Sequence, residues 1–130
     1  MTIQERDYNP AVSLGSKIGM FVGGAVVTQA TNRTTGVTIN ALSGAITTNN
    51  ASLAAEGAAS FVVTNNNVEI GDVVLVSQRS GAVGVMTDVV VIAVAAGSFT
   101  LAVMNGNVAA GTAETGAIII NFIVLKAVSA

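Results

Sequence analysis

Apolar and polar residues alternate along much of this chain with the period of two that is typical of half-buried β-strands. The alternation is clearest over residues 98–103, and residues 60–64 and 73–78 have the same strand-like composition. Continuous runs of mostly β-branched residues at 89–94 and 118–120 indicate strands covered on both faces. Helical periodicity is sustained nowhere, and only residues 48–59 offer room for a short helical turn.

Turn residues separate these segments at the spacing expected for a sandwich or barrel of about eight strands. Gly23-Gly24 suggests a bulge or kink inside a first strand, because glycines in a strand often mark such sites. Residues 37–40 and 45–47 flank a short turn and predict a β-hairpin. Tight turns are predicted at 65–67 and 95–97, and a long loop at 105–116.

A chain of 130 residues corresponds to one domain. We divide it into an N-terminal arm, residues 1–18, and a β-sandwich domain, residues 19–130. The arm contains the only tyrosine, Tyr8, and the only proline, Pro10. It is either a frayed terminus or an arm that docks on a neighbour through Tyr8, whose ring has a polar tip.

Charged residues make up only 9% of the sequence, whereas hydrophobic residues reach 52%. A solitary soluble domain keeps about 25% of its residues charged. Here Ser, Thr, Asn, Gly and Ala must cover most of the exterior. Because such residues are inexpensive to bury against a neighbour and an unpaired charge is not, the composition favours a subunit of an assembly.

The chemistry of most enzymes is missing. The sequence has no His and no Cys, which excludes the usual nucleophile, base and zinc-ligand sets. Glu69 and Asp72 are the nearest thing to a catalytic carboxylate pair, but Gly71-Asp72 is better explained as a turn that leads into a strand. Asn65 and Asn67 with these acids do not match a calcium loop. We therefore expect no enzyme, no cofactor and no metal.

We expect no nucleic-acid and no membrane partner, because of the charge distribution and the lengths of the apolar segments. The five basic residues are scattered and the net charge is −2, so no phosphate-binding patch is expected. The uncharged stretch 89–113 is interrupted by turn residues, and this pattern indicates two strands rather than a membrane helix. The first ten residues lack the apolar core of a signal peptide.

Several segments together resemble a known group of proteins. They are residues 27–47, residues 60–65, Val68, residues 72–76, residues 95–99 and residues 120–124. Their order is similar to that of the capsid decoration (cement) proteins of tailed bacteriophages. The resemblance implies a jelly-roll-like antiparallel β-sandwich that forms a homotrimer. It also implies binding to the major capsid protein on the outer surface of the virion, which is assembled in the host cytoplasm.

Two other readings stay open at this point. One is a phage tail or fibre-associated β module that binds a host surface, and the other is an adhesin-like β domain of a cell surface. Candidate contacts to the capsid or to other subunits are Tyr8 and Pro10 in the arm, and Met20, Phe21 and Val22 after it. The alternative for the last three is a place in the core of the sandwich.

Overall fold

The computed structural model describes residues 24–109 and 111–127. The described chain contains eight strands and no helix. The strands are β1 (Ala25–Thr28), β2 (Val37–Thr38), β3 (Ser43–Thr47), β4 (Ala58–Thr64), β5 (Val73–Ser80), β6 (Thr87–Ala95), β7 (Ser98–Asn105) and β8 (Ile119–Leu125). All of them lie within the predicted sandwich domain, while the arm at 1–18 lies outside the described residues. Within those ranges, nothing has the length and apolar character of a membrane-spanning helix.

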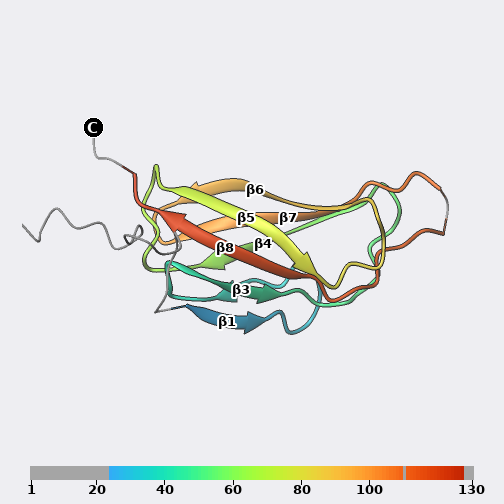
Figure 1. Cartoon of the computed structure of the whole chain (residues 1–130), viewed down its shortest axis with the longest axis horizontal. Coiled ribbons are helices and arrows are strands. Elements are labelled where there is room, and N and C mark those ends of the chain that lie inside the picture. The colour runs from blue at the N-terminus through green and yellow to red at the C-terminus, as the bar shows by residue number, and fades with distance from the viewer. Residues whose placement is uncertain (1–23, 110, 128–130) are drawn as a thin grey trace, which may run out of the picture.

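The strands form two four-stranded sheets that pack face to face (Figure 1). The first sheet has the order β1-β3-β8-β5 and the second has the order β2-β4-β7-β6. The predicted all-β sandwich of about eight strands is thereby confirmed. The sheets are mixed rather than wholly antiparallel, because β1 runs parallel to β3 and β2 runs parallel to β4. The jelly-roll connectivity is not confirmed.

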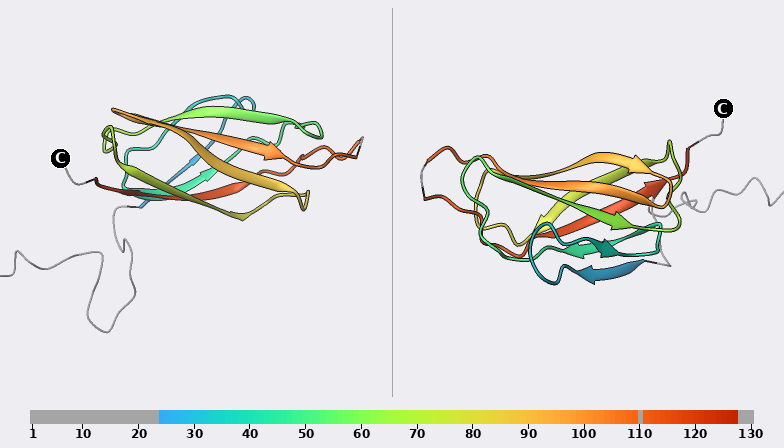
Figure 2. Two further views of the ribbon diagram at one scale, coloured as in Figure 1. Left: turned by 90° about the horizontal axis from the view of Figure 1, so that it is seen from above. Right: turned by 180° about the vertical axis from the view of Figure 1, so that it is seen from behind.

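The two sheets lie one above the other (Figure 2), and the core lies between them, where the inward-facing residues of the strands are buried. In β4 the pattern is strict, since Phe61 and Val63 are buried and their neighbours are exposed. Phe99 of the second sheet meets Phe122 of the first, with ring centroids 5.5 Å apart. Each such side chain contributes about 1.5–3 kcal/mol when it is fully buried. In β4 the period of two in the sequence thus predicts the inner face correctly. The prediction that residues 89–94 are covered on both faces is wrong, because Ile92 is 55% exposed.

The predicted hairpin over residues 37–47 is wrong. β2 and β3 belong to different sheets: β2 pairs with β4, and β3 pairs with β1 and β8. The residues between them cross from one sheet to the other, with Ile39 and Ala41 buried on the way. Two strands joined by a short turn form a hairpin only if they hydrogen-bond to each other. Here β2 and β3 instead hydrogen-bond to strands that are more distant in the sequence.

The turn at 95–97 is confirmed, with Gly97 at φ +80°, a conformation that favours glycine. The turn at 65–67 is confirmed as well: the Asn65 Oδ1 accepts a hydrogen bond of 3.0 Å from the Asn67 N–H. The described segment 48–59 forms no helix. It is held instead by backbone hydrogen bonds between Leu53 and Glu114 in both directions, at 2.9 and 2.8 Å.

Candidate interaction surfaces

The strands of the sandwich carry almost no charge. Among the strand residues that the structure describes, only Arg79 in β5 and Asp88 in β6 are charged. Both are exposed. A partner that packs on either sheet therefore removes few ions from water, and an unpaired buried ion would cost several kcal/mol.

Four apolar side chains gather at one end of the outer face of the first sheet. Val73 lies opposite Leu125, and Leu75 lies opposite Ile123 in the antiparallel β5/β8 pair. Val73 and Leu75 are 49% and 51% exposed, whereas Val74, the residue between them, is buried. We name these four residues (Val73, Leu75, Ile123 and Leu125) the β5/β8 patch.

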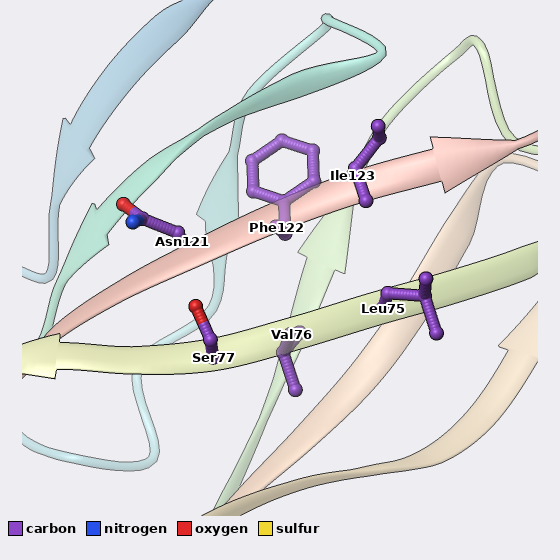
Figure 3. A pocket seen from close by; sticks show the side chains of 6 residues that line it. All are labelled: Leu75, Val76, Ser77, Asn121, Phe122 and Ile123. Carbon is purple, nitrogen blue, oxygen red and sulfur yellow. The ribbon is translucent and has the colours of Figure 1, made fainter. Parts of the chain in front are cut away.

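A shallow depression of about 220 Å³ lies between β5 and β8 beside this patch (Figure 3). Its lining consists of Leu75, Val76, Ser77, Asn121, Phe122 and Ile123. Ser77 and Asn121 are cross-strand neighbours, so the depression passes from an apolar end to an uncharged polar end. With no ionic group in its lining, it suits an uncharged chain segment better than a charged ligand.

The outer face of the second sheet is built from small and apolar side chains. In β4, Ala58, Ser60, Val62 and Thr64 are all exposed. They face β7 residues of similar character across the pair, namely Met104, Ala102, Thr100 and Ser98. The most apolar of the exposed β4 positions is Val62, which is 47% exposed. Asp88 of β6, which lies opposite Met104, is the one charged strand residue described on this face, and the rest of the face offers an uncharged surface for another protein.

Two links between strands form a third apolar surface at one end of the sandwich (Figure 1). The link from β5 to β6 exposes Val83, Val85 and Met86, and the link from β7 to β8 exposes Val108. Val85 is 94% exposed. The Gly106 N–H donates a hydrogen bond of 2.8 Å to the Met86 carbonyl and joins the two links. We name Val83, Val85, Met86 and Val108 the loop-end patch.

A fully buried carboxylate, Glu114, holds this end together. Its Oε1 accepts hydrogen bonds from the N–H groups of Val83 at 2.9 Å and Gly116 at 2.7 Å. Its Oε2 accepts from the Gly84 N–H at 2.8 Å and from the Thr87 hydroxyl. Burial raises the pKa of Glu114, but these four hydrogen bonds outweigh that effect and lower the pKa to about 2. The carboxylate therefore stays ionised and fixes both links.

The buried guanidinium of Arg33 ties a third segment to the same region. It donates to the carbonyls of Ala51, Glu114 and Gly116, the last at 2.8 Å, and to the Thr48 hydroxyl at 3.2 Å. Burial lowers the pKa of Arg33, and the nearby Glu114 carboxylate opposes this shift. Because both buried ions have protein partners, they stabilise the loops and are not available to a ligand.

Glu69 and Asp72, the acidic pair considered in the sequence, lie in a turn at the opposite end of the sandwich. The Asp72 carboxylate accepts from the Glu69 N–H at 2.8 Å, from Lys126 Nζ at 2.6 Å and from the Ala127 N–H at 3.0 Å. The hydrogen bond from Lys126, followed by those from the backbone, lowers the pKa of Asp72 to about 2. The prediction of a turn that leads into β5 is confirmed.

The predicted contact residues cannot be placed in this fold. Tyr8, Pro10, Met20, Phe21 and Val22 all lie outside the described residues. Sequence reasoning also missed the surfaces that the structure does present. For the loop-end patch a signal existed, since valines at 83 and 85 inside a Gly-rich turn have no core to face. For the burial of Arg33 and Glu114 the sequence contains no signal, because each lies in a polar loop whose residues are expected to be exposed.

In the described ranges, no group of three or more acidic side chains is arranged to hold a metal ion. Comparison of the chain with protein-family models, with curated proteins and with solved structures finds no match.

Proposed function

We propose that this protein is a structural virion protein that binds the outer surface of a tailed-bacteriophage head as a trimer. In this role it stabilises, or cements, the lattice of the major capsid protein. The observation that carries the proposal is the near-absence of charge from the strands of both sheets, where Arg79 and Asp88 are the two exceptions in the described chain.

Faces with so few charges suit a protein that stays in contact with other proteins. Each Å² of apolar surface that a contact buries contributes roughly 25 cal/mol. The second sheet and the loop-end patch offer such surface with few ions that would have to be desolvated. A trimer that places three copies of each surface on a symmetric lattice also gains affinity from several simultaneous contacts.

The assignment to a phage head rests on the resemblance described above, which lies in residues 27–125. These residues include all of the sandwich strands except the beginning of β1. A β-sandwich is the fold that the resemblance implies, and the two four-stranded sheets support the proposal at that level.

The first experiment measures the mass of the purified protein in solution by size-exclusion chromatography with light scattering. The second mixes the protein with purified, expanded phage heads that lack it and measures co-sedimentation. We expect a stable trimer and saturable retention on the heads, with unexpanded heads as the control.

A monodisperse monomer that does not sediment with heads would contradict the proposal. Immunogold labelling of intact virions decides the location. Label on the head surface is the expected result, and label on the tail alone would select the tail or fibre-associated module instead.

A further inference from the structure

The β5/β8 patch is an apolar surface that no described residue covers. Its members Val73 and Leu75 are about half exposed, and Leu125 is 40% exposed. The neighbouring outward positions on the same sheet, such as Ser43 and Ser77, are uncharged. Contiguous exposed apolar patches often mark surfaces where another chain segment or protein binds.

The described chain begins beside this patch. Gly24, its first residue, precedes β1, and a Cβ atom placed on Gly24 would lie 3.8 Å from Ser43 Oγ. Ser43 lies opposite Ile123, and Ile123 lies opposite Leu75. Figure 1 shows the start of β1, the end of β8 and the start of β5 at the same end of the sandwich. The described chain therefore starts in the same row of the first sheet as Leu75 and Ile123 of the patch.

The preceding residues are long enough to cross it. Three strand spacings separate Gly24 from Leu75, a distance of about 14 Å. Five extended residues span about 16 Å. Gly23 and Gly24 lack a Cβ, so the backbone can reverse there at little steric cost.

The composition of those residues matches the patch. Residues 18–22 contain Ile18, Met20, Phe21 and Val22 and no charge. The charges of the N-terminal region all come earlier, the last of them at Lys17. An apolar segment thus stands directly before an apolar, uncharged surface that it can reach.

We propose that residues 18–22 fold back across the outer face of the first sheet of their own chain and cover the β5/β8 patch. The proposal does not depend on the function proposed above. It leaves the second sheet and the loop-end patch as the surfaces for other proteins.

Disulfide trapping tests the proposal in the full-length protein, which has no cysteine of its own. The double variant Met20→Cys/Leu75→Cys is oxidised and analysed by non-reducing gel electrophoresis and mass spectrometry. We expect an internal disulfide within one chain in most of the protein, because the four residues from Gly24 to Met20 span about 13 Å when extended. The matched control, Met20→Cys/Ser60→Cys, places the second cysteine on the exposed outer face of the second sheet, and we expect at least ten-fold less internal disulfide.

A second version of the trapping experiment tests whether a neighbouring copy of the protein covers the β5/β8 patch. Chains with Met20→Cys alone and chains with Leu75→Cys alone are unfolded, mixed, refolded together and oxidised. A covalent dimer from this mixture, in place of the internal disulfide, would overturn the proposal and assign the patch to a neighbouring copy. Equal trapping in the double variant and its control would also overturn it.

Hydrogen–deuterium exchange of the backbone amides tests the same docking without introduced cysteines. Leu75→Asp is a surface substitution on β5, and its folding is checked by circular dichroism. We expect the amides of residues 18–22 to exchange at least ten-fold faster in Leu75→Asp than in the native protein, and Ser60→Asp to leave them unchanged. Unchanged exchange in a folded Leu75→Asp would contradict the docking.

Discussion

The Glu114 Oε1 atom accepts a hydrogen bond of 2.9 Å from the backbone N–H of Val83. This bond joins the link between β7 and β8 to the link between β5 and β6. The two residues are 31 positions apart in the sequence. The buried Glu114 carboxylate therefore connects the two links that carry the loop-end patch.

Replacing this ion with a neutral isostere should destabilise the protein. In Glu114→Gln one acceptor oxygen becomes an NH₂ group that faces backbone donors, so at least one buried N–H loses its partner. We expect the free energy of unfolding in urea to fall by about 2–3 kcal/mol. The control is Glu56→Gln in an exposed loop, for which a change within about 0.5 kcal/mol is expected. Equal effects of the two substitutions would contradict the role given to Glu114.

Stability should depend on pH in the acid range. The pKa of Glu114 is lowered to about 2 in the folded protein from an ordinary value of 4.5, and that of Asp72 to about 2 from 3.8. Below their ordinary values, the unfolded chain binds protons that the folded chain does not. The stabilisation is therefore complete above about pH 5 and is lost progressively as the pH falls toward 2.

The measurement for this pH dependence is the urea midpoint at a series of pH values from 7 to about 2.5. We expect a flat region near neutrality and a steep decline below pH about 4.5. Glu114→Gln should have a shallower decline, because its contribution to the proton linkage is gone. A decline as steep as in the native protein would assign the acid sensitivity to other groups.

Substitutions at two glycines with similar positive φ angles allow the cost of a steric clash to be distinguished from the cost of backbone strain. Gly81 has φ +92°, and a Cβ atom there would lie 2.0 Å from the Ala117 carbonyl oxygen. Gly97 has φ +80°, and a Cβ atom there meets nothing within 4 Å. Gly97→Ala should cost about 1 kcal/mol for the left-handed conformation. Gly81→Ala should cost at least about 3 kcal/mol, since backbone must also move.

Thermal and urea unfolding of both variants provide the comparison. If Gly81→Ala were as mild as Gly97→Ala, the close approach of the 81–86 link to Ala117 would be wrong.

A single charge on the outer face of the second sheet should weaken assembly without weakening the fold. Val62 is 47% exposed, so Val62→Asp places a carboxylate in water in the isolated chain but buries it in any contact that uses this face. We expect trimer formation or head retention to fall at least ten-fold, equivalent to about 1.4 kcal/mol. The free energy of unfolding of the monomer should change by less than about 1 kcal/mol.

The matched control for this variant is Asn66→Asp, which adds the same charge in an exposed turn. We expect it to leave both association and stability unchanged. If Val62→Asp assembles and binds heads like the native protein, the second sheet is not a contact face.

The strand segments could be predicted well because each depends on neighbours in the sequence. Residues 98–103 alternate in the sequence and lie in β7 with Phe99, Leu101 and Val103 buried. The turns at Asn65 and Gly97 follow from side chains or backbone freedom that act within three residues. The pairing of strands did not follow, and the hairpin at 37–47 failed because partners such as β4 and β8 come from elsewhere in the chain.

The sequence by itself determined that this protein is built of strands, which side chains face inward, and that few ions are available for its surface. These properties arise from the period of two and from composition, which are local or additive. Only the tertiary structure decided that Arg33 and Glu114 are buried, because the partners of Arg33 include Gly116, 83 residues away. It also decided that Leu75 and Ile123 meet on one outer face, since register between distant strands is set by the packing of the whole sandwich.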